Sequence, residues 1–213
     1  MRILIKEILR IPFGETTLPE SWIYAGGKKE NKIPIIFSVF LIITRDKKIL
    51  VDAGCETMPG FEMRNFTTPM LALKERGIDP GEITDVIITH AHHDHIQCVR
   101  YFENARVHIQ KEERDRGEKY LAGHTQISVF ETEKEITEGV KLVKIGGHSP
   151  GSCVVECHMD GKIFVLCGDE CYCRYNLENR IPTASSCCPE NSRAFIEKYA
   201  KDPYCCLLCH DPK

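Results

Sequence analysis

Four histidines and one aspartate fall between His90 and His95, directly after the apolar run Asp-Val-Ile-Ile-Thr at 85–89. A short run rich in β-branched residues favours a buried strand. The polar side chains would therefore lie at the end of that strand and in the loop behind it, held by a rigid core. Any fold for this chain has to accommodate that arrangement.

The spacing of these side chains indicates a metal site. His90 and His92 are two residues apart, so on an extended backbone both imidazoles point to the same side and reach one cation. Asp94 and His95 follow as the chain turns, and they offer a carboxylate and another imidazole to a neighbouring position. Such ligands suit zinc, and also iron, cobalt or manganese. The alternatives are a polar surface turn and a histidine-rich low-complexity tract, but a tract would lack the preceding strand and distant partners.

Composition excludes several other classes of protein. A chain of 213 residues suits a single domain spanning 1–213 with a sizeable core. Its net charge of −3 provides no basic field for nucleic acid, and it has no apolar stretch of the ~18 residues that a membrane span requires. Lys6 and Glu7 stand where a signal peptide needs an apolar run, which predicts a cytoplasmic protein.

Twelve cysteines are many for such a chain. Without an export signal they are expected as thiols, and those in apolar surroundings as small core residues. A second metal or redox site is an alternative hypothesis, built from Cys171-x-Cys173 and from the three cysteines at 205, 206 and 209.

Apolar alternation and turn residues divide the chain into short elements. Strands are predicted at 2–11, 35–43, 48–52, 85–89, 105–109, 126–130, 140–145, 153–157, 162–167 and 205–208. Helices are predicted at 67–76, 111–120 and 190–201. Residues 12–34 contain several prolines and glycines and are predicted to form a long loop. In that loop Trp22 and Tyr24 either cover a pocket or pin a surface loop. A second loop at 55–66 offers apolar residues for a substrate wall or for the core, namely Met58, Phe61, Met63 and Phe66.

Further polar residues stand at the ends of other predicted strands. Asp52, Asp169 and His210 each end or follow one, and His148 lies in the turn sequence Gly-Gly-His-Ser-Pro-Gly-Ser at 146–152. Glycines there let the backbone approach a ligand closely. Several predicted strands are thus followed directly by an aspartate or a histidine. Such a repeated arrangement would rarely arise if these side chains had unrelated roles.

The H-x-H-x-D-H string at 90–95 and the G-H-S-x-G-S loop at 147–152 resemble motifs of the metallo-β-lactamase superfamily of hydrolases, and within it the N-acyl-homoserine lactonase branch. The resemblance implies a four-layer αβ/βα sandwich with two mixed sheets flanked by helices. It also implies that His90, His92 and His148 hold one metal, that Asp94, His95 and His210 hold the other, and that Asp169 bridges them. Asp52 would orient a ligand from behind, or be an ordinary strand-end aspartate.

For activity, the resemblance implies two divalent metal ions that hold a hydroxide, and this hydroxide attacks an ester or lactone of a small molecule. Zinc is the first candidate for both ions, and iron, manganese or cobalt are alternatives. Asp94 would move a proton to the leaving group. Tyr172, in a D-x-x-Y spacing from Asp169 and before an N-x-E-x-x-x-P run at 176–182, would help to hold the carbonyl oxygen, or else only pack. Ile96-Gln97-Cys98 departs from the glycines of many members, and the segment between Asp52 and His90 is short.

Other activities stay open at this point. A thioesterase or a phosphodiesterase of the same fold would use the same ligands. A non-catalytic module that binds a metal or a ligand is a reading from a different class. No nucleic-acid or membrane partner is expected, and a homodimer is compatible with the sequence.

Overall fold

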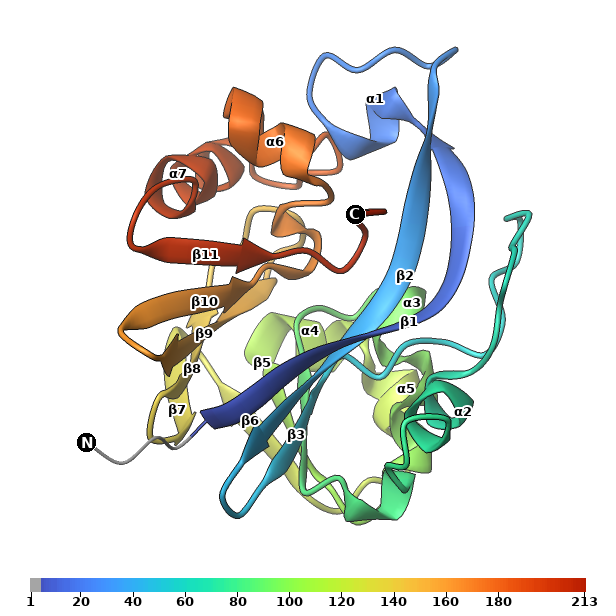
Figure 1. Cartoon of the computed structure of the whole chain (residues 1–213), viewed down its shortest axis with the longest axis vertical. Helices are drawn as coiled ribbons and strands as arrows, with labels where there is room; N and C mark the ends of the chain where they lie inside the picture. The colour runs from blue at the N-terminus through green and yellow to red at the C-terminus, as the bar shows by residue number, and fades with distance from the viewer. Residues whose placement is uncertain (1–4) are drawn as a thin grey trace.

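Two mixed β-sheets form the centre of the computed structural model, which describes residues 5–213 (Figure 1). The first sheet has the strand order β1-β2-β3-β4-β5-β6, with β3 to β6 parallel. Its strands are β1 (Ile5–Pro19), β2 (Lys32–Thr44), β3 (Lys48–Val51), β4 (Asp85–Ile88), β5 (Arg106–Gln110) and β6 (Ile127–Phe130). The second sheet has the order β11-β10-β9-β8-β7, with only β10 and β11 parallel. Its strands are β7 (Glu133–Thr137), β8 (Val140–Lys144), β9 (Cys153–Met159), β10 (Lys162–Leu166) and β11 (Tyr204–Leu207).

Side-chain alternation along these strands builds three separate apolar cores. In β4, Val86 and Ile88 join the core on the helix side of the first sheet, whereas Ile87 joins the core between the sheets. In β9, Val155 lies in the core between the sheets and Val154 in the core outside the second sheet. Successive residues of a strand point to opposite faces, so each sheet is apolar on both sides. Three cores separate four layers, and the predicted αβ/βα sandwich is confirmed.

Helices cover the outer face of each sheet (Figure 1). Those of the first sheet are α2 (Pro69–Lys74), α3 (His93–Ile96), α4 (Lys111–Arg116) and α5 (Glu118–Leu121), with the 3-10 turns η1 (Pro80–Glu82) and η2 (Gln97–Tyr101). Those of the second sheet are α6 (Arg174–Asn179) and α7 (Pro189–Tyr199), and η3 (Gly168–Glu170) follows β10. The short helix α1 (Glu20–Ile23) connects β1 to β2. Of the four apolar positions that periodicity predicts for the buried face of α7, Phe195, Ile196 and Tyr199 are buried and Ala194 is exposed.

The prediction of a loop over residues 12–34 was wrong. Strand β1 continues to Pro19, and β2 begins at Lys32, so the two form one long antiparallel hairpin. Prolines are tolerated here because β1 is an edge strand, and the register shifts at Pro12. Strand β7 and helix α6 were not predicted. The sequence of β7, Glu-Lys-Glu-Ile-Thr, is polar because it forms the exposed edge of the second sheet.

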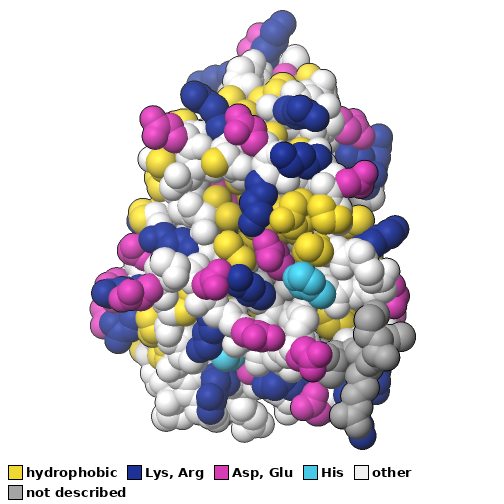
Figure 2. Space-filling model, turned by 90° about the vertical axis from the view of Figure 1, so that its left-hand side faces the viewer, with side chains coloured by type: hydrophobic (Ala, Val, Ile, Leu, Met, Phe, Trp, Pro, Cys, Tyr) yellow, Lys and Arg dark blue, Asp and Glu magenta, His cyan; other side chains and the backbone are white. Residues whose placement is uncertain are grey.

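Charged side chains are intermixed over the face drawn in Figure 2. Lysines and arginines alternate there with aspartates and glutamates, and among the coloured residues neither sign forms an extended patch. Between residues 5 and 213, the structure contains no helix that is both long enough and apolar enough to cross a membrane.

Several loops that follow strands open at one edge shared by the two sheets. β3 and β4 are parallel neighbours, and so are β10 and β11, so the carboxyl ends of each pair lie together. β8 runs in the same direction as β10, because each is antiparallel to β9. The predicted polar residues at strand ends all come from these five strands. Loop residues at such an edge are a common location for ligand sites in α/β proteins.

Candidate metal centre

The histidine run leaves β4 in an extended conformation and then enters α3. Thr89, the residue after β4, donates its backbone N–H to Asp52 Oδ1 at 2.8 Å, which fixes the start of the run. His92 is the N-cap of α3 and has extended backbone, whereas Asp94 and His95 lie in the first turn of the helix. The change of backbone conformation sends the two pairs of side chains to two neighbouring positions.

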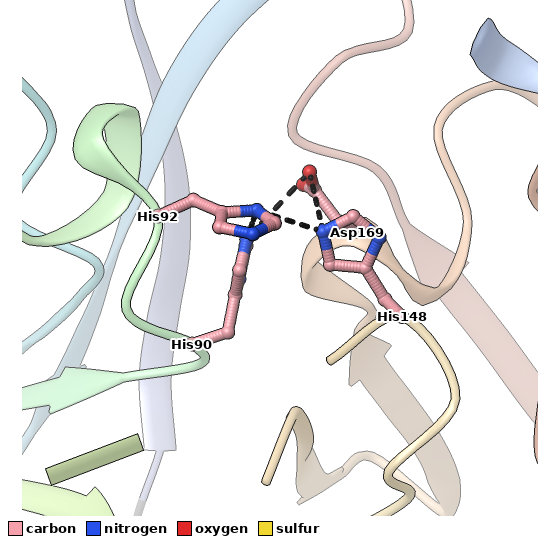
Figure 3. A group of neighbouring side chains, drawn as sticks. All are labelled: His90, His92, His148 and Asp169. Atoms are coloured by element: carbon pink, nitrogen blue, oxygen red, sulfur yellow. Dashed lines mark hydrogen bonds and ion pairs between the residues drawn. The ribbon is translucent and has the colours of Figure 1, made fainter. Parts of the chain in front are cut away.

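The first position is formed by His90, His92 and His148 with one oxygen of Asp169, and Figure 3 shows these side chains pointing toward one another. His92 Nδ1 lies 3.0 Å from His90 Nε2 and 2.9 Å from His148 Nε2. A neutral imidazole nitrogen cannot form well-directed hydrogen bonds to two others at once without leaving lone pairs opposed. Three nitrogens that converge in this way form a site for a shared cation.

The second position is formed by Asp94, His95 and His210. Asp94 Oδ2 lies 3.5 Å from His95 Nε2 and 3.9 Å from His210 Nε2. His95 is buried, and its Nε2 makes no well-directed hydrogen bond within residues 5–213, although Asp169 Oδ1 lies 3.0 Å away. A buried polar atom without a partner is costly, and a cation at this position would provide one.

Asp169 lies between the two positions and faces both. Its Oδ2 is 3.5 Å from His148 Nε2 and 3.7 Å from His90 Nε2. Its Oδ1 is 3.0 Å from the Nε2 atoms of both His95 and His210. One carboxylate thus presents a separate oxygen to each group of ligands. The structure brings together all seven side chains that the sequence resemblance selected.

Hydrogen bonds behind the imidazoles fix which nitrogen faces the centre. His95 Nδ1 donates to Asp52 Oδ2 at 2.8 Å, His210 Nδ1 donates to the carbonyl of Ile36 at 3.0 Å, and His148 Nδ1 donates to the carbonyl of Ser185. Carbonyl and carboxylate oxygens only accept, so the Nδ1 atoms carry hydrogen and the Nε2 atoms are left for a ligand.

The centre also balances its charges. Burial lowers the pKa of His90 well below its ordinary value, which keeps that imidazole neutral. Burial acts in the same direction on His95, but the carboxylates of Asp169, Asp94 and Asp52 outweigh it and hold its pKa well above the ordinary value. Burial would raise the pKa of Asp169, yet His95 and the other histidines hold it well below the ordinary range. The carboxylates are therefore ionised. A cation at His95 Nε2 would replace the proton that this raised pKa implies, and the donor set of imidazole nitrogens and carboxylate oxygens fits a pair of divalent cations.

The loop that carries His148 is held by a carboxylate that the sequence did not reveal. Glu170 Oε1 accepts the backbone N–H groups of Gly147 and His148, both at 3.0 Å, and the hydroxyl of Ser152. A Cβ at Gly147 would lie 2.4 Å from Glu170 Oε2, so only glycine allows this approach. Glu170 directly follows Asp169, and nothing in its sequence context separates it from a solvated acid.

A cavity of about 420 Å³ opens beside the centre. Trp22, Met58 and Phe61 line it, so for these residues the prediction of a pocket cover or a substrate wall is confirmed. Met63 and Phe66 instead follow the alternative prediction and only pack against the helix-side core of the first sheet. Tyr24 packs on Tyr175 instead. The complete lining is Leu18, Trp22, Ile35, Phe37, Met58, Pro59, Phe61, His92, His93, Asp94, Asp169, Tyr172, Ser185 and His210.

Tyr172 forms part of the cavity wall next to the second position. Its ring is stacked on that of His210, with the centroids 5.1 Å apart. Burial and the negative charge of Asp169 raise the pKa of Tyr172 well above its ordinary value. The phenol therefore keeps its proton and can donate it in a hydrogen bond. The run after it has a structural role, because the Asn176 side chain donates to the carbonyl oxygens of Ile23 and Ile181 and so ties α1 to α6.

The structure does not bring the cysteines at 171, 173, 205, 206 and 209 together in a site of their own. All twelve cysteines are free thiols. Within residues 5–213, the only group of three metal-type ligands with a cysteine joins Cys209 to Asp169 and His210 of the centre already described. Cys205 and Cys206 are consecutive residues of β11, so their side chains point to opposite faces of the sheet and cannot share one site.

Comparison with known proteins agrees with this architecture. Residues 36–170 match the metallo-β-lactamase superfamily. An N-acyl homoserine lactonase of Bacillus thuringiensis is 26% identical over 208 residues, covering 84% of this chain and 82% of the relative. The N-acyl homoserine lactonase AiiB of Agrobacterium fabrum is 25% identical over 214 residues, covering 78% and 77%.

Among solved structures, an N-acyl homoserine lactone hydrolase with the product N-hexanoyl-L-homoserine at its catalytic metal centre superimposes with a TM-score of 0.85 at 21% identity, covering all of this chain and 95% of the other. The dizinc lactonase AidC, also with a bound product, gives 0.79 at 17% identity, covering 100% and 90%. The match over 36–170, together with the sandwich and its ligand set, places this chain in the metallo-β-lactamase superfamily.

Proposed function

We propose that this protein is a metal-dependent hydrolase that opens the ester bond of a small lactone, with N-acyl homoserine lactones as the first candidates. One observation carries the proposal: seven metal-type ligands converge beside a cavity that four of them line, His92, Asp94, Asp169 and His210, and whose other lining residues are mostly apolar. The names of the relatives, N-acyl homoserine lactonases from two genera, support the same substrate class.

His90, His92 and His148 would hold one cation and Asp94, His95 and His210 the other, with Asp169 shared. Zinc is the first candidate, supported by the nitrogen-rich donor set and by the dizinc relative AidC. When bound, two such cations polarise a carbonyl group and lower the pKa of water enough for it to act as a nucleophile near neutral pH.

Two side chains of the cavity have the right chemistry for the remaining steps. Burial would raise the pKa of Asp94, but the interaction with His95 outweighs it and lowers that pKa, so the carboxylate is ionised. Asp94 would accept the proton that the attacking water gives up and pass it to the alkoxide that leaves when the ring opens. Tyr172 would donate a hydrogen bond to the substrate carbonyl oxygen, where negative charge develops.

The cavity favours a neutral acyl substrate over a phosphodiester. Leu18, Ile35 and Phe37 form its inner apolar wall, and Trp22 and Phe61 meet edge to face at its mouth, with ring centroids 6.4 Å apart. Among the described residues that line it, none is a lysine or an arginine. A phosphodiester would find no lysine or arginine to pair with its negative charge. An acyl chain would instead bury apolar surface, which stabilises the complex by ~25 cal/mol for each Å² removed from water.

We also propose that 1–213 works as a single domain and that it resides in the cytosol. Eight buried and four partly or fully exposed cysteines, all free, are typical of a reducing compartment.

The test combines elemental analysis with turnover on lactone, thioester and phosphodiester substrates, including lactones of increasing acyl length. We expect about two metal ions per chain and the highest kcat/KM on lactones with an acyl chain. His92→Ala should lose metal and activity together. Both metal affinity and activity should fall by more than the roughly 10- to 100-fold expected when a residue that only hydrogen-bonds to a metal ligand is removed. His158→Ala, which changes an exposed histidine of β9, is the control. A protein that binds two metals but turns over no substrate of the panel would be a binding module instead.

A further inference from the structure

Glu113 is fully buried although it belongs to the charged helix α4. Its neighbours Glu112 and Arg114 are exposed, as expected for the sequence Lys-Glu-Glu-Arg-Asp-Arg. An ionised carboxylate is rarely buried unless several donors surround it, because removal from water is costly. The donors around Glu113 therefore show which segments it holds.

Both oxygens of Glu113 accept hydrogen bonds from the loops of the metal centre. Oε2 accepts the backbone N–H of Ala91 at 2.8 Å. Oε1 accepts the hydroxyl of Ser149 at 2.7 Å and the backbone N–H of Gly151 at 2.9 Å. The nearest cation is Arg116, whose Nε lies 3.7 Å from Oε2.

These contacts tie together the two loops that carry the first position. Ala91 stands between His90 and His92 in the loop after β4, and Ser149 follows His148 in the loop after β8. The two loops come from different sheets, and one backbone hydrogen bond joins their bases, from Cys153 N–H to the carbonyl of Thr89 at 2.9 Å. The Glu113 carboxylate adds a connection closer to the ligands, at Ala91, Ser149 and Gly151.

The packing around Glu113 is tight on the side of the second loop. A Cβ at Gly151 would lie 2.1 Å from Gln110 Oε1 and 2.9 Å from Glu113 Cγ, so a glycine is needed for the loop to reach the carboxylate. The second position has a separate support, because Asp52 orients His95. The first position therefore has two buried carboxylates behind it, Glu170 on the His148 loop alone and Glu113 between both loops, whereas Asp52 supports the second.

We propose that Glu113 is a positioning residue that sets the distance between the 90–92 and 148–151 loops and thereby the metal affinity of the first position alone. This inference rests on the proposed dinuclear centre. Its selectivity for one of two positions separates it from a general contribution to folding, which would weaken both.

The substitution Glu113→Gln tests this with little change in volume. Whichever way the amide is turned, its NH₂ group faces a backbone N–H, either that of Ala91 or that of Gly151. A backbone N–H cannot reverse its role, so one of the two loops loses its anchor. Glu112→Gln, the same change one residue earlier at an exposed site paired with Lys144, is the matched control.

The two positions are separated by ligand variants. His210→Ala leaves the first position intact, and His148→Ala leaves the second. Zinc affinity is measured in each background by competition with a chromophoric chelator. In the His210→Ala background, Glu113→Gln should weaken zinc binding by about 10- to 100-fold, the usual effect of an outer partner. In the His148→Ala background the change should stay below about threefold, as should the effect of Glu112→Gln in either.

Equal losses in both backgrounds, or no loss in the first, would overturn the role of Glu113 while leaving the dinuclear centre in place. Failure of the unsubstituted protein to bind two metals would overturn both proposals. If Glu113→Gln does not fold, Ser149→Ala replaces it, because this change removes one of the three donors and leaves the carboxylate. It should weaken the first position by about 2- to 10-fold and spare the second, the scale of one hydrogen bond.

Discussion

Asp52 offers the sharpest test of how the second position is built. Its carboxylate accepts the backbone N–H of Thr89 at 2.8 Å, the Thr89 hydroxyl, and His95 Nδ1 at 2.8 Å. It also has a left-handed backbone with φ 63°, which asparagine tolerates and alanine does not. Asp52→Asn therefore changes the charge and one acceptor without adding backbone strain.

The expected magnitude follows from the hydrogen bond to His95. If the amide oxygen keeps Thr89, the amide NH₂ faces His95 Nδ1, and the imidazole must carry its hydrogen on Nε2 to avoid two opposed donors. That tautomer has no lone pair toward the second position. A hydrogen bond to a charged group contributes about 1.5–3 kcal/mol, which corresponds to roughly 10- to 150-fold in metal affinity.

Zinc competition in the His148→Ala background isolates the second position and measures this loss directly. Asp46→Asn, an exposed aspartate in the turn before β3, is the control and should bind zinc normally. In the otherwise unsubstituted protein, Asp52→Asn should retain one tightly bound metal and lose the other on dialysis. Normal affinity in the His148→Ala background would refute the argument that the hydrogen bond from His95 to Asp52 selects the tautomer.

Two other expected outcomes concern the cavity and the far end of the first sheet. Tyr172→Phe should lower kcat on lactones by up to about 100-fold, with KM and metal content unchanged, because only the donor to the developing charge is lost; an unchanged kcat would leave Tyr172 as a packing residue. Asp85 is buried, and although burial raises its pKa, hydrogen bonds from His108, Lys47 and Thr84 lower it below the ordinary range. Its folded pKa lies below the unfolded value of about 3.9, so its stabilisation is nearly complete above about pH 5 and is lost progressively as the pH falls from there through the folded pKa. Asp85→Asn should cost about 1.5–3 kcal/mol of unfolding free energy at pH 7 and a smaller amount near pH 3, measured by urea denaturation at both pH values. A cost that does not depend on pH would contradict the assignment.

The ligands of the centre could be selected from the sequence because the resemblance to metallo-β-lactamase motifs names them, and because each follows a strand or lies in a short turn motif. His90 and His210 stand directly behind apolar runs, and His148 lies among glycines. Local sequence is informative at such places, since both the strand and the turn depend on nearby residues. The role of Asp52 came from the same resemblance.

Glu113 and Glu170 could not be selected in this way. Glu113 is one of several charges in a short helix, and only the tertiary structure shows that it faces two loops rather than solvent. Similarly, the prolines of residues 12–19 indicated a loop, because the sequence does not show that β1 is an edge strand where a missing N–H costs little. In both cases the deciding contacts join residues far apart in the chain.

Much of the apolar wall of the cavity comes from a different part of the chain than the predicted metal ligands. Leu18, Trp22, Ile35 and Phe37 belong to the β1–β2 hairpin, whereas every predicted metal ligand lies at or after His90. The hairpin touches the centre through the Ile36 carbonyl, which accepts from His210, so substrate range can change through the side chains at 18, 22 and 35 while that backbone contact is kept. A library confined to this hairpin would explore new acyl groups at little risk to the metals, and chimaeras that exchange the hairpin between relatives should inherit the preference of the hairpin donor.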